Sequence, residues 1–356
     1  MRQTGWKNFL ASLALLFGSL CLSAIAGEII LRLLGHHGAP QSIISNIYPV
    51  DDKMLDWRYV PNSQLKLGRV VYSYNSVGFR DREHAIEKSP GITRVVVLGD
   101  SVTEGAGVEW DSVFAPALQS RLGGRFEVIN IAAAGLNTPQ EVHLLEQKAL
   151  FYKPDYVILN FILNDCDFFS SFKGAARYVA EKDASISLLN ISIHPRLKQL
   201  LKSSAALYFL KERLENAKAR LMGVEETDYF TNLWSKAENR AKVVRGFDKL
   251  SHLAKEHRFE VVVIIWPLIT DYKQYKFQHL HEWLKEQTET RGFSTVDLFP
   301  TFSRILYRDL QVNAEDNVHP NVLGHKLAVD ALLGRNLLQP NANYDSVREN
   351  PMRLRR

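Results

Sequence analysis

Three residues in two distant parts of the chain have the types and spacing of a serine nucleophile with its base. Ser101 follows a glycine and an aspartate, and Asp316 precedes His319 by three residues on one short segment. A serine hydroxyl becomes an effective nucleophile when a base takes its proton, and a histidine base needs a carboxylate on its other ring nitrogen. The spacing lets Asp316 reach Nδ1 of His319 while Nε2 faces Ser101. We therefore predict that these residues carry out acyl transfer through a covalent intermediate.

Acyl transfer also needs hydrogen-bond donors that point at the oxyanion of the tetrahedral intermediate. Three groups that follow apolar runs are candidates: the backbone N–H of Ser101, the backbone N–H of Gly135 and the side-chain amide of Asn164. Each piece taken alone also fits an ordinary turn, and a single Asp-x-x-His is nearly uninformative. The prediction depends on the elements that bring these groups together.

Short apolar runs, rich in β-branched and aromatic residues, alternate with segments of helical periodicity from residue 93 onward. The predicted strands are residues 94–98, 126–131, 156–162, 259–266 and 294–299. The predicted helices are residues 111–123, a helix that begins at 138, and residues 235–257, 276–291 and 322–338. This alternation is typical of an α/β fold. We expect a flavodoxin-like three-layer sandwich with a five-stranded parallel sheet in the order 2-1-3-4-5, flanked by helices.

The strand order decides where the candidate residues lie. In the order 2-1-3-4-5 the second and third strands flank the first, so Gly135 and Asn164 are expected on either side of Ser101. Ligands of such sheets bind beyond the carboxyl ends of the strands. Two helix starts are also predicted: a capping box at 138–141, with proline at the first helical position, and Asn321 as the cap of the last helix.

Placed in this way, the residues resemble the SGNH hydrolase superfamily, also called GDSL esterases and lipases, over about residues 93–338. The resemblance is carried by four blocks: Gly99-Asp100-Ser101, Gly135, Asn164-Asp165 and Asp316-x-x-His319-Pro320. It implies that Ser101 is the nucleophile, that His319 is the base and that Asp316 orients the base. It also implies that Gly135 and Asn164 are oxyanion donors.

Two positions depart from the family pattern. Val102 stands where the family name has leucine, and Ile162 stands where a Gly-x-Asn-Asp pattern has glycine. The second departure bears on the substrate class more than on the chemistry.

Residues 75–80, Asn-Ser-Val-Gly-Phe-Arg, also resemble a bacterial subset of these proteins that has an N-terminal membrane segment. The simplest interpretation of that stretch is a turn with Gly78 at positive φ.

An apolar segment near the start has the length of a membrane span. Residues 9–27 contain no charged residue. A cleaved signal peptide is the alternative, because Ala24-Ile25-Ala26 resembles a cleavage site, although the run is long for a signal. We expect residues 1–35 to be a retained, single-pass anchor. Arg2 and Lys7 favour the cytoplasm for the short N-terminal side, which puts the catalytic domain outside the bacterial cytoplasmic membrane.

The rest of the chain divides by composition. Glu28 and Arg32 are four residues apart and can pair, so the first helix is expected to continue past the membrane surface. The remaining segments are a turn-rich extension with short strands at 36–92, the hydrolase domain at 93–338, and a basic, disordered tail at 339–356. An insertion at about 167–233, with helical periodicity at 196–222, fits either a lid over the site or an added packing layer.

Composition and motifs exclude several other classes. The net charge of +5 is spread along the chain, which argues against nucleic acid as a partner. Cys21 lies in the apolar segment, so no disulfide framework is expected, and Cys166 is expected to be a buried thiol. No metal or cofactor is expected, because the histidines lack ligand spacing and neither phosphate-binding nor dinucleotide-binding glycine motifs occur. Gly-x-Ser-x-Gly is also absent, which argues against an α/β-hydrolase. The histidines considered are His36, His37, His279, His281 and His325.

Together these inferences predict a membrane-anchored, extracytoplasmic serine esterase or deacylase that cleaves acyl esters, with acylated envelope glycan or lipid as candidate substrates. Two alternatives remain open. One is an O-acyltransferase that passes the acyl group to a glycan hydroxyl with the same three residues. The other is a non-catalytic carbohydrate-binding protein of the same fold. The sequence leaves the acyl chain length, the acceptor and the oligomeric state open.

Overall fold

The computed structural model of the protein describes residues 2–34, 43–166, 226–314 and 316–340, together with residues 173, 203–207, 209–210 and 213–214. Backbone contacts divide the chain into two units, Met1–Ser42 with Val179–Asp228, and Ile43–Tyr178 with Tyr229–Arg356. The insertion predicted at 167–233 and the tail predicted at 339–356 lie largely outside the described residues. His36 and His37 lie entirely outside them.

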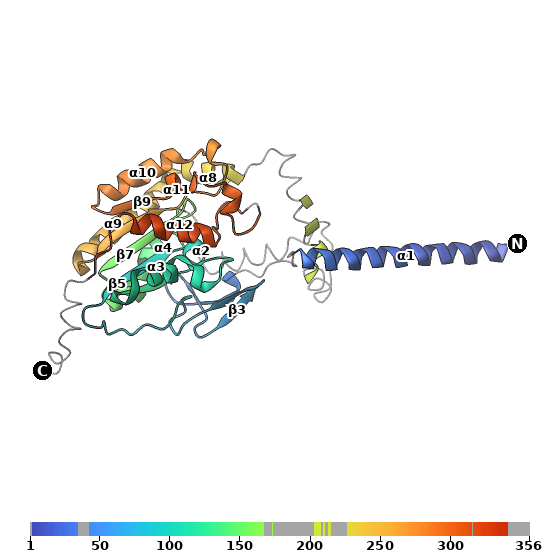
Figure 1. The fold of residues 1–356 in the computed structure, drawn as a ribbon, viewed down its shortest axis with the longest axis horizontal. Coiled ribbons are helices and arrows are strands. Elements are labelled where there is room, and N and C mark those ends of the chain that lie inside the picture. The colour runs from blue at the N-terminus through green and yellow to red at the C-terminus, as the bar shows by residue number, and fades with distance from the viewer. Residues whose placement is uncertain are drawn as a thin grey trace. The chain divides into compact units, whose positions relative to one another are not determined.

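Parallel strands form a five-stranded sheet in the second unit, in the order β6-β5-β7-β8-β9 (Figure 1). In chain order this is 2-1-3-4-5, so the predicted topology is confirmed. The strands are β5 (Thr93–Gly99), β6 (Phe126–Ala132), β7 (Tyr156–Phe161), β8 (Glu260–Ile265) and β9 (Ser294–Asp297). Every residue of β5 and β7 is buried, because a parallel sheet of this kind is covered on both faces.

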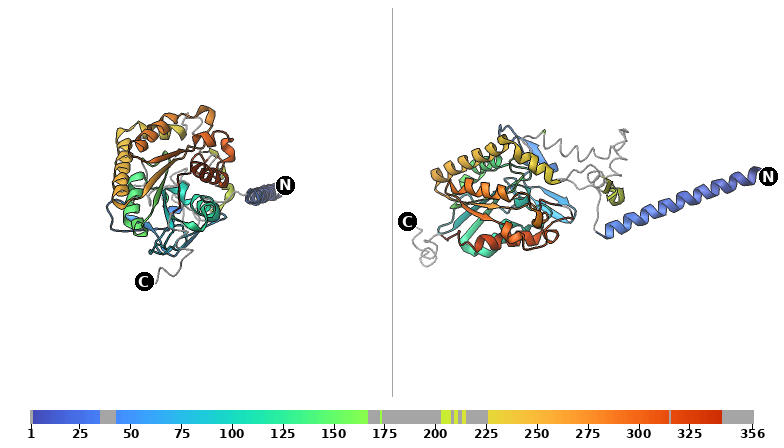
Figure 2. Two further views of the ribbon diagram at one scale, coloured as in Figure 1. Left: turned by 60° about the vertical axis from the view of Figure 1, so that its left-hand side comes forward. Right: turned by 90° about the horizontal axis from the view of Figure 1, so that it is seen from above.

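Helices cover the two faces of the sheet and complete the three layers (Figure 2). On one side α4 (Thr138–Leu144) packs against α9 (Ala237–His257), which also contacts α10 (Gln278–Glu289). On the other side α3 (Phe114–Leu122) packs against α12 (Val322–Leu333). One apolar cluster joins α3 and α12 to the sheet, and its members include Val95, Val97, Phe114, Leu118 and Val329.

Side-chain caps decide where the helices begin, and here the predictions are partly wrong. Asn321 caps α12 as predicted, because its Oδ1 accepts two N–H groups of the first turn at 2.9 and 3.3 Å. The capping box of α4 lies one residue earlier than predicted, since the carboxamide of Asn137, and not the hydroxyl of Thr138, accepts the N–H of Gln140. α12 ends before Gly334, earlier than predicted, because glycine is a poor helix former.

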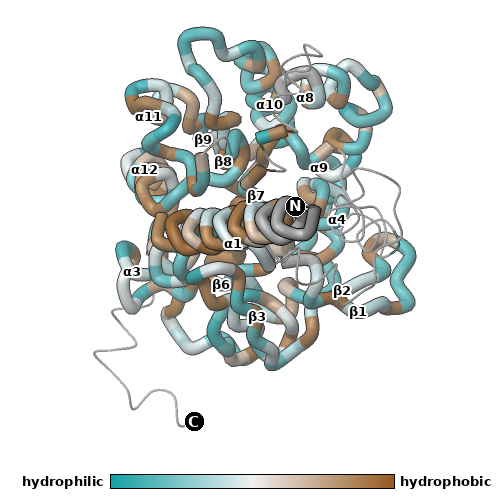
Figure 3. Tube along the Cα trace, turned by 90° about the vertical axis from the view of Figure 1, so that its right-hand side faces the viewer, coloured by the Kyte–Doolittle hydropathy of each residue, from teal (hydrophilic) through white to brown (hydrophobic). Residues whose placement is uncertain are grey.

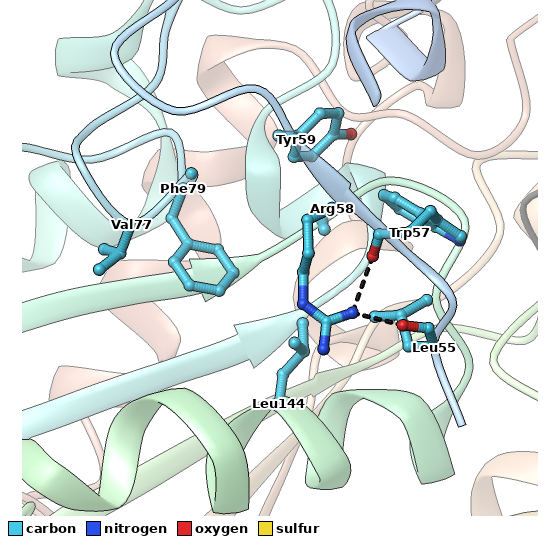
Figure 4. A pocket seen from close by; sticks show the side chains of 9 residues that line it. Leu55, Trp57, Arg58, Tyr59, Val77, Phe79 and Leu144 are labelled. Carbon is cyan, nitrogen blue, oxygen red and sulfur yellow. Dashed lines mark hydrogen bonds between the residues drawn. The ribbon is translucent and has the colours of Figure 1, made fainter. Parts of the chain in front are cut away.

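The segment that precedes the sheet, residues 43–92, forms two antiparallel strand pairs and is called the extension below. β1 (Ile47–Pro49) pairs with β2 (Trp57–Tyr59), and β3 (Gln64–Leu67) pairs with β4 (Val70–Ser73), so the short strands predicted for this part of the chain are present. Most of its aromatic side chains are buried, among them Trp57, Tyr59, Tyr72 and Tyr74, whereas Tyr48 is exposed. A small pocket lies between the extension and Leu144 of α4 (Figure 4). The extension therefore packs directly on the helices of the sheet.

The stretch at residues 75–80 is a turn, as predicted. The Asn75 side chain accepts two N–H groups of the turn at 3.2 and 2.9 Å. Gly78 has a φ of +84°, and a Cβ there would lie 2.9 Å from the carbonyl oxygen of Tyr59. Only glycine fits this conformation without strain. The turn brings Arg80 into the interior, where the residue is 1% exposed.

The first unit contains α1 (Arg2–Leu33), which is apolar along most of its length (Figure 3). By length and composition Phe9–Leu33 can cross a membrane, and an N-terminal signal sequence has the same properties. Glu28 and Arg32 pair at 2.7 Å, as predicted. The Glu28 carboxylate also accepts two N–H groups, those of Ala205 and Ala206, at 2.9 Å each, so the end of α1 is bound to another segment of its own unit.

An ion-pair network joins the extension to the amino ends of β5 and β6. Arg94 of β5 donates to Glu127 of β6 at 2.6 Å. The two ring nitrogens of the buried His84 lie 2.8 Å from Glu127 and 3.0 Å from Asp81. Burial lowers the pKa of His84, but hydrogen bonds to the two carboxylates raise it by more, so the pKa is about 8. His84 is therefore an imidazolium at neutral pH.

We expect this charge to make stability depend on pH. The folded pKa of His84, about 8, exceeds the unfolded value near 6.5, so its contribution is fully present below about pH 6.5 and is lost as the pH rises through about 8. The free energy of unfolding should therefore differ between wild type and His84→Gln by about 2 kcal/mol more at about pH 6 than at about pH 9. Denaturant unfolding of the detergent-solubilised chain measures this, and a gap that stays constant with pH would contradict a charged His84.

Candidate active site

The candidate nucleophile lies at the end of β5, which has a neighbouring strand on each side. β5 ends at Gly99, and Asp100 caps α2 (Ser101–Glu104) by accepting a backbone N–H of the first turn at 2.9 Å. A Cβ at Gly99 would collide with Thr103, so glycine is needed for this turn of helix to fold back onto the strand end. Ser101 is the first residue of α2, and its side chain is partly exposed.

The structure brings the three residues of the predicted triad together. Ser101 Oγ lies 2.9 Å from His319 Nε2. His319 Nδ1 lies 3.0 Å from Oδ2 and 3.1 Å from Oδ1 of Asp316. Burial raises the pKa of Asp316, but the hydrogen bond and charge of His319, with two backbone N–H donors, outweigh burial and hold the pKa below its ordinary value. The carboxylate is therefore ionised beside the imidazole.

The loop before α12 positions Asp316 and His319. Asp316 Oδ1 accepts the backbone N–H of His319 at 2.8 Å and that of Val318 at 3.0 Å. The base of the loop is closed by a bond of 3.0 Å from the N–H of Val312 to the carbonyl of His319, and its far side by one of 2.7 Å from the N–H of Ile269 to the carbonyl of Asn317. These bonds explain why an Asp-x-x-His segment can present both side chains on one side.

Asn164 lies after β7 and reaches the nucleophile turn through Asp100. Its Nδ2 donates to Asp100 Oδ2 at 2.8 Å, and Ser101 Oγ lies 3.4 Å from the same oxygen. Burial raises the pKa of Asp100, while hydrogen bonds from Asn164 and a backbone N–H partly oppose that rise. An amide nitrogen carries two N–H groups, so the bond to Asp100 engages one of them and orients the other.

Gly135 follows β6, on the other side of β5, in a left-handed conformation with φ of +77°. The loop that carries it is bound to the nucleophile turn at two points. The N–H of Ala133 donates to the carbonyl of Gly99 at 3.2 Å, and the N–H of Ala134 donates to Glu104 Oε2 at 2.8 Å. Gly135 and Asn164 thus lie at the ends of the two strands that flank β5, and their role as oxyanion donors stays a prediction.

Comparison with known families agrees with this arrangement. The profile of the GDSL-like lipase/acylhydrolase family matches residues 97–327, which is more than half of the chain. The chain belongs to this family. It is therefore a GDSL-type acylhydrolase, an enzyme that acts on ester bonds. Among curated proteins, a sequence comparison finds none that matches the chain.

A comparison with solved structures finds matches at low sequence identity. The crystal structure of TesA is 12% identical with a TM-score of 0.42, and the match covers 68% of this chain and 97% of that chain. For the acetyl xylan esterase AlAXEase the identity is 14%, the TM-score 0.41 and the coverage 68% and 98%. For the lipase/acylhydrolase from Enterococcus faecalis the identity is 17%, the TM-score 0.38 and the coverage 70% and 98%.

The two departures from the GDSL-family pattern are both accommodated in the core. Val102 is 2% exposed on the inner side of α2. Ile162 is 1% exposed, and its N–H donates to Asp165 Oδ2 at 3.0 Å. Neither side chain occupies the space between Ser101 and His319, which are in direct contact. The departures therefore leave the contact between the candidate nucleophile and base intact.

The described histidines outside the triad form no metal site. His281 contacts Asp297 and Tyr275 at 2.8 Å each, and His279 is exposed. His325 is fully buried, and burial lowers its pKa to about 3, so it is a neutral core residue. Within the described residues no group of three or more His, Cys, Asp or Glu side chains could hold a metal ion. Cys166 is buried, as predicted.

Sequence reasoning missed several residues around the site. It did not predict that Asp100 accepts a hydrogen bond from Asn164. It also did not predict that Glu104 accepts the N–H of Ala134, or that Arg80 donates to the carbonyl of Gly105. Arg80 belongs to the block at 75–80, but the pattern of that block predicts only a turn. An arginine after a buried aromatic residue is a candidate for internal hydrogen bonding, but the sequence names no partner for it.

The Asp316 geometry predicts the effect of a small substitution. In Asp316→Asn the amide oxygen should take the place of Oδ1, which accepts two backbone N–H groups, and the amide nitrogen should face His319 Nδ1. This selects the tautomer whose Nε2 carries a proton and cannot accept one from Ser101. We expect kcat for a p-nitrophenyl ester to fall roughly 10³- to 10⁴-fold in a folded enzyme.

The matched control is Asp330→Asn. Asp330 is a half-exposed aspartate on α12 that pairs with Arg121 at the surface, and such pairs contribute little. Its kcat should stay within about twofold of wild type. If Asp316→Asn retained the wild-type kcat, and Asp330→Asn did so as well, the role given to Asp316 would be contradicted.

Proposed function

We propose that this chain is a serine esterase or deacylase in which Ser101, His319 and Asp316 form the catalytic triad. The observation that carries the proposal is the contact of 2.9 Å between Ser101 Oγ and His319 Nε2, with Nδ1 of the same ring on Asp316. A partly buried, ionised aspartate holds the Nδ1–H tautomer, which leaves Nε2 free to accept the serine proton. Hydrolysis of an acyl ester is the chemistry that this arrangement supports best.

The proposed reaction proceeds in two steps, acylation of Ser101 and hydrolysis of the acyl-enzyme. His319 takes the proton of Ser101 as Oγ attacks the ester carbonyl carbon, and a tetrahedral oxyanion forms. His319 then gives that proton to the leaving alcohol, and the acyl group remains on Ser101. In the second step His319 takes a proton from water, the hydroxide attacks the acyl-enzyme, and the proton returns to Oγ as the carboxylic acid leaves.

The proposed oxyanion donors are the backbone N–H groups of Ser101 and Gly135 and the second N–H of the Asn164 amide. The support for Asn164 is its bond of 2.8 Å to Asp100, which fixes the orientation of the amide before substrate binds. Donors that are held in place before the reaction stabilise the oxyanion without a reorganisation cost, and removing one raises the barrier by about 2.7–4 kcal/mol in other hydrolases.

We further propose that α1 is retained as a single-pass anchor and that the hydrolase domain lies outside the cytoplasm. The candidate span Phe9–Leu33 has 25 residues and its uncharged part is residues 9–27, whereas a signal h-region has about 7–15 residues. Arg2 and Lys7 favour the cytoplasmic side for the N-terminus. Anchoring would bring the enzyme to acylated glycan or lipid of the cell envelope.

The test of the triad uses the full-length chain in detergent. Wild type should hydrolyse short p-nitrophenyl esters and react with a serine-directed fluorophosphonate. Ser101→Ala should lose both, with kcat lower by at least roughly 10³-fold. The control Ser89→Ala removes an exposed hydroxyl and should retain both. A folded wild type that neither hydrolyses nor labels would contradict the proposal.

Acyl transfer to an added glycan that outpaces hydrolysis would make the enzyme an O-acyltransferase with the same nucleophile.

The test of the anchor is the mass of the mature chain. A retained anchor gives a membrane-bound protein with an intact N-terminus, which resists extraction by high salt and dissolves in detergent. A cleaved signal gives a shorter, soluble protein that begins near residue 27. Fractionation of cells followed by intact mass measurement separates the two outcomes.

A further inference from the structure

A buried carboxylate three residues after Ser101 binds the extension to the active site. Glu104 is the last residue of α2 and is 0% exposed. Its Oε1 accepts the hydroxyl of Tyr74 at 2.9 Å, and its Oε2 accepts the hydroxyl of Tyr59 at 2.9 Å. Both tyrosines belong to the extension, Tyr59 at the end of β2 and Tyr74 just after β4. Two distant parts of the extension therefore meet on one side chain.

The same carboxylate holds the loop that carries Gly135. The N–H of Ala134 donates to Glu104 Oε2 at 2.8 Å and lies 3.1 Å from the Tyr59 hydroxyl. Ala134 directly precedes Gly135, and the peptide bond between them carries the Gly135 N–H. Because Glu104 fixes the N–H of Ala134, it also restricts the orientation of that peptide bond. The loop and α2 are thereby connected through a side chain as well as through the sheet.

Arg80 fixes the other end of the nucleophile turn. Its guanidinium donates to the carbonyl oxygens of Glu104 (2.9 Å), Gly105 (2.7 Å) and Val108 (2.8 Å). It also lies 4.0 Å from the ring centroid of Tyr72. A four-residue helix is not stable alone, because its nucleation is unfavourable. The extension thus supplies the contacts that α2 cannot make within itself.

We propose that Glu104 is a positioning residue for the hydrolase reaction, which with Tyr59 holds Ala134 so that the Gly135 N–H points at the oxyanion formed on Ser101. This inference rests on the roles proposed above for Ser101 and Gly135. Through Tyr59 the extension then helps to position an oxyanion donor, and it is not only a stretch of chain that precedes the hydrolase domain. A displacement of about 1 Å in such a donor can lower the rate by roughly 100-fold.

The chemistry of the buried group favours positioning over simple packing. Burial of a carboxylate without partners is unfavourable, and an apolar side chain would fill the same space without that cost. Burial raises the pKa of Glu104 to about 7, although the two tyrosines, Arg80 and the Ala134 N–H all lower it. In its ionised form the carboxylate accepts stronger hydrogen bonds from these donors than in its neutral form. The carboxylate therefore gives the loop a well-defined position.

The test compares Glu104→Gln, Tyr59→Phe and Tyr74→Phe in the full-length chain in detergent. Glu104→Gln keeps the size of the side chain but weakens the acceptor for Ala134, so kcat should fall roughly 10-fold with KM within about twofold. The affinity for a boronic acid, which forms a tetrahedral adduct on Ser101, should fall by the same factor as kcat. A purely structural role would not couple these two quantities.

The two tyrosines form a matched pair. Each substitution removes one hydroxyl from Glu104, but only Tyr59 bonds the oxygen that also holds Ala134. Tyr59→Phe should therefore lower kcat and boronate affinity about three- to fivefold, and Tyr74→Phe should change both by less than about twofold. If Glu104→Gln does not fold, this pair decides the question by itself.

The control for the loss of a carboxylate distant from the site is Glu127→Gln, at the amino end of β6. It should lower stability without a change in kcat per folded enzyme, because Glu127 binds Arg94 and His84 at the end of the strands opposite to Ser101. If Glu104→Gln behaves like Glu127→Gln, with kcat and boronate affinity unchanged, the positioning role is wrong. Failure of the triad itself would appear separately, as activity that survives Ser101→Ala.

Discussion

A hydrogen bond of 2.9 Å joins Ser101 to His319 across 218 positions of the chain, and most of the fold is needed to form it. Ser101 lies at the end of β5, whereas the chain that leads to His319 leaves the sheet from β9, at its edge. The loop before α12 returns from that edge, and α12 then packs on α3, which contacts β6 next to β5. The packing of the two helices is therefore what brings the imidazole back to the nucleophile.

Hydrogen bonds to carboxylates fix the groups at both ends of this bond. Asp316 is bound by two backbone N–H groups of its own loop, so its carboxylate cannot turn away from the imidazole. On the nucleophile side, Asp100 caps α2 with one oxygen and binds Asn164 with the other. Two carboxylates, the buried Asp100 and the partly exposed Asp316, thus fix the loop ends that carry the nucleophile and the base, each through hydrogen bonds to backbone and side chain at once.

Much of this architecture follows from local patterns in the sequence. The buried strands are continuous apolar runs, the parallel sheet follows from the α/β alternation, and Asn321 is an evident helix cap. Local patterns fail where two residues of the same type compete, as at Asn137 and Thr138, since both can cap a helix. They also fail where partners are distant: the bonds from Tyr59 and Tyr74 to Glu104 span 45 and 30 positions, in segments without periodicity.

The position of the extension changes what counts as the folding unit of this enzyme. The family match begins at residue 97, after the whole of the extension, and a reader of that match would place a domain boundary there. Yet Tyr59, Tyr74 and Arg80 bind groups that are buried beneath the nucleophile turn. The region that the family match covers is thus smaller than the compact unit, which begins at Ile43. In this chain the family pattern marks where the chemistry is, and the compact unit that supports the chemistry begins some fifty residues earlier, on the order of half a typical domain length.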